Sequence, residues 1–143
     1  SQRYVLSGYS QGALAIHLYL RTRATEAERA LISSVVLVAD PARVDFGDEL
    51  LYEDGMNSAG VGVQLSKGVY ALFGAMPGAG SLPTDIVGRT LSLCYKKDIV
   101  CAPGSGWGAS ATVHGSYDQH ASDLAELGDL SATDAAHDIP SQP

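Results

Sequence analysis

The segment Gly8-Tyr9-Ser10-Gln11-Gly12 constrains this chain more than any other feature of its sequence. It matches the pattern G-x-S-x-G. A short β-type run at residues 4–7 precedes it, and residues 13–23, which include helix formers and no breaker, follow it. A strand, a sharp turn and a helix are the setting in which this pattern lifts a serine hydroxyl clear of a sheet. The pattern therefore predicts an α/β fold with Ser10 as a nucleophile.

Glycine stands on both sides of Ser10 for a steric reason. We expect Gly8 and Gly12 to lie so close to the neighbouring strand and helix that only a small residue fits. Gln11 would open the helix, where its backbone N–H can stabilise an oxyanion. The alternative interpretation is an ordinary glycine-rich turn between a strand and a helix.

Strand-like and helix-like segments alternate along the chain. The run Val35-Val36-Leu37-Val38 is apolar on both faces, which suits a buried parallel strand. The predicted elements are strands at 4–7, 33–39 and 90–95, helices at 13–23, 25–32 and 117–127, the last ended by Gly128, and irregular chain at 44–62. This order predicts a parallel sheet with its site at the carboxyl ends of the strands.

Composition and charge narrow the classes of function. Apolar residues make up 45% of the 143 residues and charged residues 17%, which is typical of one compact domain. No apolar run reaches the length of about 18 residues that would span a bilayer. The net charge of −7 arises mainly beyond Tyr117, where acidic residues have no basic neighbours, and residues 129–143 are predicted to form a polar acidic tail. Without a basic patch, nucleic acid is not an expected partner.

A nucleophilic serine needs a base to take its proton. Four histidines are candidates. His17 lies about two helical turns from the serine and would point elsewhere, and His137 lies in the acidic tail. His114 follows a loop, whereas His120 falls inside the last predicted helix. His114 is therefore the favoured base, with His120 as the alternative.

The base in turn needs an orienting carboxylate, and the cysteines help to select it. Asp98 lies between Cys94 and Cys101, and a disulfide would close a short loop that holds this carboxylate in place. The rival is Asp40 at the end of the second strand, where it could equally be a strand-end cap. The cysteine spacing fits neither a redox C-x-x-C motif nor a zinc site. A local disulfide and an oxidising compartment are expected, with two buried thiols as the alternative.

Three segments together resemble the cutinase family of serine esterases. They are Gly8-Tyr9-Ser10-Gln11-Gly12-Ala13, Cys94-Tyr95-Lys96-Lys97-Asp98-Ile99-Val100-Cys101 and His114-Gly115-Ser116-Tyr117. The resemblance covers residues 1–128 and implies the C-terminal part of an α/β-hydrolase domain. Such a domain is a three-layer sandwich with a mostly parallel sheet, here without its first strands.

The resemblance implies Ser10, Asp98 and His114 as a catalytic triad and the N–H of Gln11 as one oxyanion donor. The family's second donor belongs to an earlier part of its chain, so we expect the natural protein to be longer. The expected protein is a secreted, monomeric esterase of lipid or polyester substrates that uses no metal or cofactor. The alternatives are an acetylxylan-type carbohydrate esterase and a truncated, non-catalytic binding module.

Substrate choice is less constrained by the sequence. An apolar, glycine-interrupted stretch could line an acyl groove or form a buried helix and its loop. Its residues are Val69, Tyr70, Leu72, Phe73, Met76 and Leu82. Trp107, shortly before His114, could wall the site or simply pack in the core.

Overall fold

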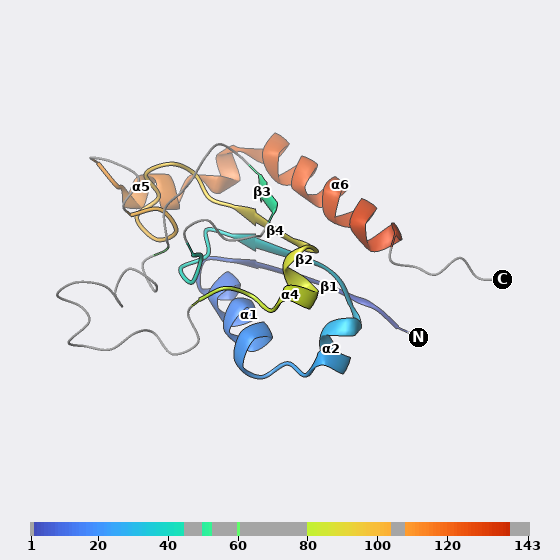
Figure 1. The fold of residues 1–143 in the computed structure, drawn as a ribbon. Helices are drawn as coiled ribbons and strands as arrows, with labels where there is room; N and C mark the ends of the chain where they lie inside the picture. The colour runs from blue at the N-terminus through green and yellow to red at the C-terminus, as the bar shows by residue number, and fades with distance from the viewer. Residues whose placement is uncertain (1, 45–49, 53–59, 61–79, 104–107, 138–143) are drawn as a thin grey trace, which may run out of the picture.

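The fold is built on a parallel sheet with helices on both faces (Figure 1). The computed structural model describes residues 2–44, 50–52, 60, 80–103 and 108–137. In chain order the elements are β1 (Tyr4–Tyr9), α1 (Gln11–Thr22), α2 (Glu26–Ala30), β2 (Ile32–Val38), β3 (Leu50–Tyr52), α4 (Thr84–Val87), β4 (Thr90–Leu93), α5 (Ala111–His114), the 3₁₀ turn η2 (Tyr117–Gln119) and α6 (Ala121–His137). Within this part of the chain the strands pair in parallel in the order β1-β2-β4-β3. The predicted α/β class is confirmed.

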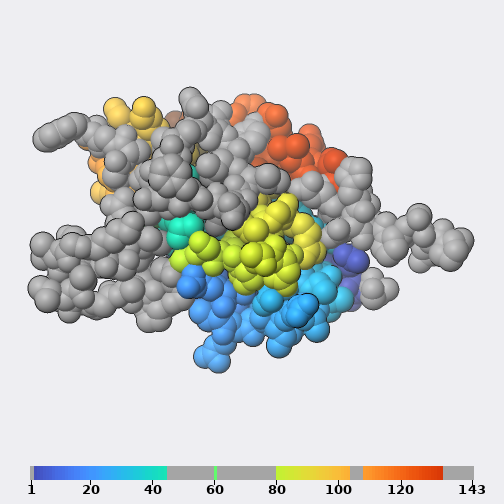
Figure 2. Space-filling model, in the orientation of Figure 1, coloured from blue at the N-terminus to red at the C-terminus, as the bar shows by residue number. Residues whose placement is uncertain are grey.

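Strand β2 lies at the centre of the core, and it is buried along its whole length. Its side chains alternate between two faces, as the pleat of a strand requires. Val35 and Leu37 pack with residues of α1 and α4, whereas Val36 and Val38 pack with Leu127 of α6. The sheet is thus covered on one face by α1, α2 and α4 and on the other by α6. On the first of these faces α4 lies against α2, as the yellow-green and blue atoms of Figure 2 show.

Helix α2 begins where its sequence predicts. The Thr25 hydroxyl accepts a hydrogen bond from the Glu28 N–H at 3.2 Å, and the Glu28 carboxylate accepts one from the Thr25 N–H at 2.7 Å. This reciprocal pair is a capping box, which satisfies donors that a helix start leaves without partners. The Thr25 N–H and the Thr25 hydroxyl both donate to the Glu28 carboxylate, and these two hydrogen bonds lower its pKa.

The last helix differs from the prediction. It runs from Ala121 to His137 and passes through Gly128, so the prediction that it ends at Gly128 is wrong. Beyond the glycine, Ser131 is buried and its hydroxyl donates to Ser34 of β2 at 2.9 Å. Packing of this turn against the sheet outweighs the cost of about 1 kcal/mol that an interior glycine imposes on a helix. No described helix is long and apolar enough to cross a bilayer.

Strand β3 falls within residues 44–62, for which the sequence predicts irregular chain, so this prediction is wrong at residues 50–52. Leu50 to Tyr52 pair with Leu91 to Leu93 of β4. A three-residue strand is too short to show periodicity, and its pairing depends on a partner distant in sequence. The strand therefore had no local signal in the sequence.

Candidate active site

Ser10 lies in the turn that joins β1 to α1. Its backbone has φ 52° and ψ −114°, a left-handed φ that side chains rarely adopt. The Ser10 N–H donates to the Val38 carbonyl at 2.8 Å, and the Ser10 carbonyl accepts from the Leu14 N–H at 3.0 Å. These bonds to the neighbouring strand and to the following helix hold the strained turn, as a nucleophile elbow requires.

The two glycines of the turn differ in their surroundings. A Cβ at Gly8 would lie 2.6 Å from the backbone carbon of Gly12 and 2.7 Å from the Ala13 nitrogen, so a side chain would force β1 and α1 apart. A Cβ at Gly12 would meet no heavy atom of the described residues within 4 Å. The steric argument therefore holds for Gly8 and was wrong for Gly12 as far as the described residues extend.

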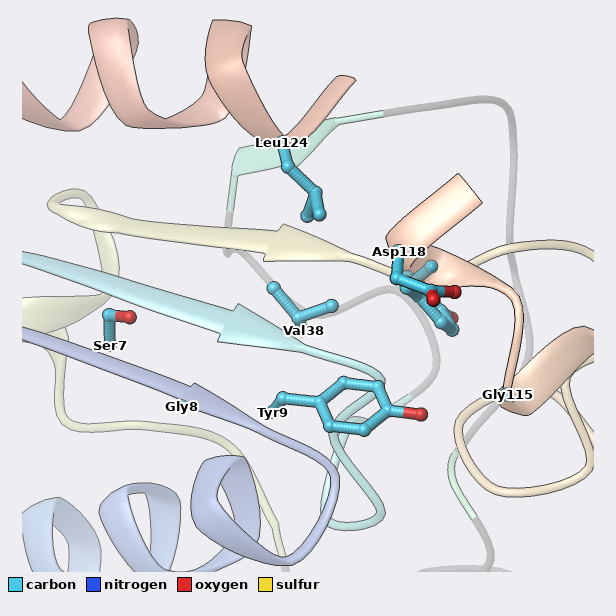
Figure 3. Close-up of a pocket in the computed structure, with 8 residues that line it drawn as sticks. Ser7, Gly8, Tyr9, Val38, Gly115, Asp118 and Leu124 are labelled. Carbon is cyan, nitrogen blue, oxygen red and sulfur yellow. The ribbon is translucent and has the colours of Figure 1, made fainter. Parts of the chain in front are cut away.

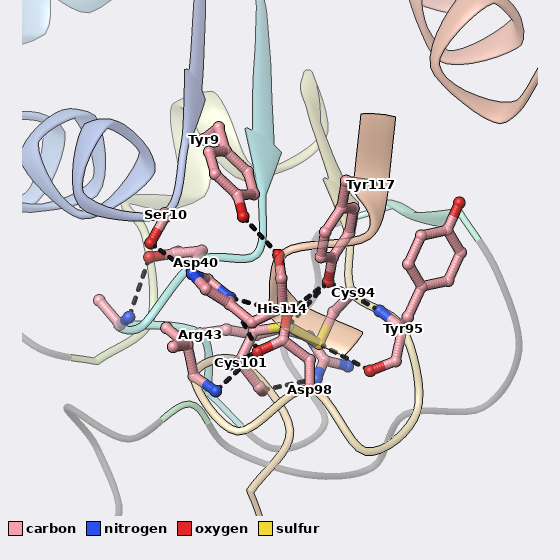
Figure 4. The surroundings of a disulfide bond; sticks show 12 residues. Tyr9, Ser10, Asp40, Arg43, Cys94, Tyr95, Asp98, Cys101, His114 and Tyr117 are labelled. Carbon is pink, nitrogen blue, oxygen red and sulfur yellow. Dashed lines mark hydrogen bonds and ion pairs between the residues drawn. A yellow bond between two sulfur atoms is a disulfide. The ribbon is translucent and has the colours of Figure 1, made fainter. Parts of the chain in front are cut away.

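The structure brings Ser10, His114 and Asp98 together in one hydrogen-bonded line (Figure 4). The Ser10 hydroxyl lies 2.8 Å from His114 Nε2, and His114 Nδ1 lies 3.0 Å from each carboxylate oxygen of Asp98. Because a carboxylate only accepts, Nδ1 donates to Asp98, which leaves Nε2 of a neutral ring free to accept from the serine. This tautomer is the one that a general base toward Ser10 needs.

Asp98 is fully buried and anchored by several donors. Its Oδ1 accepts from the N–H groups of Val100 at 2.6 Å and Cys101 at 3.2 Å, and its Oδ2 accepts from the Tyr117 hydroxyl at 2.7 Å. The predicted disulfide between Cys94 and Cys101 is present, with an S–S distance of 2.05 Å. It closes the turn that supplies the two N–H donors. Charge-assisted hydrogen bonds of this kind compensate for burying a carboxylate.

Tyr117 belongs to the segment His114-Gly115-Ser116-Tyr117 that resembles the cutinase family, but the sequence alone assigns it no contact. The Tyr117 hydroxyl donates to Asp98 and accepts from the Tyr95 N–H at 3.0 Å. Burial raises the pKa of this hydroxyl far above its usual value, and the nearby Asp98 carboxylate raises it further. Tyr117 therefore stays protonated and remains a donor to Asp98 across the working pH range.

Tyr9 was also missed, because it occupies a variable position of the G-x-S-x-G pattern. Its hydroxyl donates to the backbone carbonyl of His114, and its ring stacks on the imidazole with a centroid distance of 5.4 Å and an interplanar angle of 19°. Figure 4 shows this hydrogen bond beside Ser10. No local sequence signal pairs residues so far apart in the chain.

The rival acid, Asp40, pairs with His17, whereas His114 pairs with Asp98. Asp40 is buried and its carboxylate contacts His17 Nδ1 at 2.5 Å, while His17 Nε2 lies 2.6 Å from the Gly80 carbonyl. One ring nitrogen thus faces Asp40 and the other faces the Gly80 carbonyl, so His17 ties α1 to the end of β2. His120 is half-exposed beside Asp123. His137 ends α6, far along the chain from the elbow.

The remaining predicted residues have mixed outcomes. Gln11 is the first residue of α1. The N–H groups of a helix's first turn have no hydrogen-bond acceptor within the helix, so the Gln11 N–H can face a ligand. Leu82 is buried in the core with Leu20 and Ile86, which fits the packing interpretation. The other residues of the proposed acyl groove, and Trp107, lie outside the described residues.

A cavity of about 340 Å³ lies beside Tyr9, between the sheet and α6 (Figure 3). Residues of β1, the η2 turn and α6 line it, and its walls include Ser7, Val38, Asp118 and Leu124. The Tyr9 side chain stands at its border, with the hydroxyl on the side of Gly115. The cavity thus adjoins the residue that stacks on His114.

Two kinds of comparison with known proteins found similarity over most of this chain. The family model described as Cutinase matches residues 1–126. Among solved structures, a cutinase-like protein from Cryptococcus sp. is similar, with a TM-score of 0.65 and 25% sequence identity. The match covers 99% of this chain and 62% of that protein, so the chain spans less than two thirds of the length of this neighbour. A search of curated proteins found no match.

Proposed function

The chain belongs to the cutinase family, and we propose that it acts as a serine carboxylic-ester hydrolase with Ser10, His114 and Asp98 as its triad. The observation that carries this proposal is the hydrogen-bonded line from the Ser10 hydroxyl through the His114 ring to the Asp98 carboxylate. A serine, a base and a buried carboxylate in this order are the arrangement that activates a hydroxyl for acyl transfer.

In the proposed reaction, the Ser10 hydroxyl oxygen attacks the ester carbonyl while its proton passes to His114 Nε2. Asp98 holds the ring through Nδ1 and stabilises the imidazolium that forms. The N–H of Gln11 is one donor to the oxyanion. Collapse of the tetrahedral intermediate transfers the proton from His114 to the leaving alcohol and leaves an acyl-Ser10. Water, deprotonated by the same ring, then releases the acid and restores Ser10.

The proposed substrates are esters with apolar acyl groups, such as lipids or polyesters. A large apolar side chain beside the acid supports this choice, because Ile99, which follows Asp98, is 44% exposed. Exposed apolar side chains at a site favour binding of apolar ligands. The proposal includes secretion, which the disulfide supports, since disulfides persist in oxidising compartments. It also includes action as a monomer.

Steady-state kinetics on aryl esters of increasing acyl length test the proposal. We expect hydrolysis to prefer acyl chains longer than acetyl and to fall by about 10⁴-fold or more in Ser10→Ala. Ser7→Ala is the matched control and should retain wild-type rates, because Ser7 lies on β1, three residues before Ser10, and none of the described hydrogen bonds joins it to His114. Hydrolysis that survives in Ser10→Ala would disprove the proposed nucleophile, and a strict preference for acetyl esters of carbohydrates would disprove the substrate class.

A further inference from the structure

We propose that Tyr9 is a positioning residue that holds the base, His114, in line with the nucleophile, an inference that rests on the proposed esterase function. Tyr9 directly precedes Ser10 and contacts His114 twice, once with its hydroxyl and once with its ring. One segment of chain therefore carries the nucleophile and holds the base.

The first contact fixes the backbone of the base. His114 is the last residue of α5, a helix of four residues. Such a short helix is unstable by itself, and its last carbonyls have no partner within the helix. The Tyr9 hydroxyl donates to the His114 carbonyl and so joins this helix to the end of β1. A shift of about 1 Å between reacting groups can lower the rate about 100-fold. The hydrogen bond from Tyr9 therefore affects catalysis, because it fixes the distance between His114 and Ser10.

The second contact fixes the ring. The rings of Tyr9 and His114 are stacked at 5.4 Å with an angle of 19° between their planes. A stacked neighbour limits rotation of the imidazole, which must present Nε2 to Ser10 and Nδ1 to Asp98 at once. An aromatic face also attracts a cation, so the stack favours the imidazolium that the reaction forms.

Ordinary core packing does not account for Tyr9. Its side chain is 46% exposed, nearly the same fraction as the 48% of Tyr4 at the other end of β1. Burial, with the charges of Asp98 and Asp118, raises the pKa of the Tyr9 hydroxyl, so it remains protonated and able to donate. Tyr4 is therefore a matched control, since it is the same residue type on the same strand with equal exposure.

The test compares Tyr9→Phe and Tyr9→Leu with Tyr4→Phe and Tyr4→Leu in the intact protein. The measurements are kcat and KM for a short soluble aryl ester, the proton NMR signal of the His114 Nδ1–H, and the thermal unfolding midpoint. We expect kcat to fall about fivefold in Tyr9→Phe, which loses one hydrogen bond. In Tyr9→Leu it should fall about 50-fold, because the stack is lost as well. KM should stay within about twofold, and the NMR signal should broaden.

The outcomes separate this inference from the proposed function. Both Tyr4 variants should match the wild type, with similar unfolding midpoints throughout. Wild-type kcat with a sharp NMR signal in the Tyr9 variants would overturn the inference alone. A raised KM with unchanged kcat would also overturn it, since Tyr9 would then act by binding substrate. An inactive wild type would overturn the proposed function. If Tyr9→Leu does not fold, kcat and the NMR signal of Tyr9→Phe, which keeps the ring, test the inference.

Discussion

At the scale of single residues, the site depends on how a buried carboxylate is held. Asp98 has no exposed surface, and its oxygens are occupied by His114, by two backbone N–H groups and by Tyr117. A carboxylate in such a place stays charged only while its donors remain. The orientation of His114 therefore depends on residues that never approach the substrate.

Replacement of Tyr117 by phenylalanine tests this dependence. The change removes the hydrogen bond to Asp98 Oδ2 and keeps the ring in the core. We expect the free energy of unfolding to fall by about 1–3 kcal/mol and kcat/KM to fall by about tenfold, because a buried charged acceptor loses its donor. Urea unfolding and ester kinetics measure both effects. Tyr19→Phe, an exposed tyrosine of α1, is the control and should change neither.

The sequence led to the three side chains that the structure brings together, but not to their supports. Ser10 could be predicted because the elbow is a local motif, and Asp98 and His114 because their positions follow from chain order and the cysteine loop. Tyr9 and the hydrogen bond of Tyr117 could not be predicted. Their contacts join residues distant in sequence, and aromatic side chains at such positions are as compatible with packing as with a site.

At the scale of elements, the elbow depends on close contact between β1 and α1. Gly8→Ala should lower the unfolding midpoint strongly and abolish ester hydrolysis, because the new methyl group would lie 2.6 Å from the Gly12 backbone. Gly12→Ala is the matched change, with open space around the new methyl group and a better helix former in place of glycine. It should keep the wild-type midpoint. Equal losses in the two variants, measured by thermal unfolding, would contradict this account of the elbow.

The disulfide between Cys94 and Cys101 holds the turn that contains Asp98. It joins residues separated by seven positions and encloses Asp98. Chain-entropy arguments give a loop of this length about 2.5 kcal/mol of stability. The double variant Cys94→Ala/Cys101→Ala should lose about that amount in urea unfolding. Its kcat should also fall, because the turn that donates to Asp98 is loosened. Unchanged kcat with lower stability would show that the disulfide does not position the acid.

Local patterns located most elements but not all of their ends. Strand β2 could be predicted because its run is apolar on both faces, and helix α2 because it begins at Thr25, a residue type that caps helices; both are local properties. The end of α6 and the existence of β3 are set by tertiary contacts. Ser131 finds its partner on β2, and residues 50–52 find theirs on β4.

At the scale of the whole molecule, the buried tyrosine of the site links its stability to alkaline pH. Burial raises the pKa of Tyr117 above its ordinary value of 10.0. The folded protein therefore holds this proton more tightly than the unfolded chain. The resulting stability is fully present below pH 10.0 and is lost as pH rises further.

We therefore expect the free energy of unfolding to decline as pH rises above about 10, with a shallower decline in Tyr117→Phe. Urea unfolding at a series of alkaline pH values measures the slope in both proteins. The ultraviolet absorbance of tyrosinate should show at least one tyrosine that titrates only on unfolding. An identical slope in wild type and Tyr117→Phe would contradict the assignment of this effect to Tyr117.

The proposed function requires that His114 and Asp98 activate Ser10 as a nucleophile. Labelling with a fluorophosphonate probe, followed by peptide mass spectrometry, detects such a serine directly. We expect one covalent adduct, on the peptide that contains Ser10, retained in Ser7→Ala, much slower to form in His114→Ala and absent in Ser10→Ala. An unlabelled wild type, or an adduct on another residue that persists in Ser10→Ala, would disprove Ser10 as the activated nucleophile.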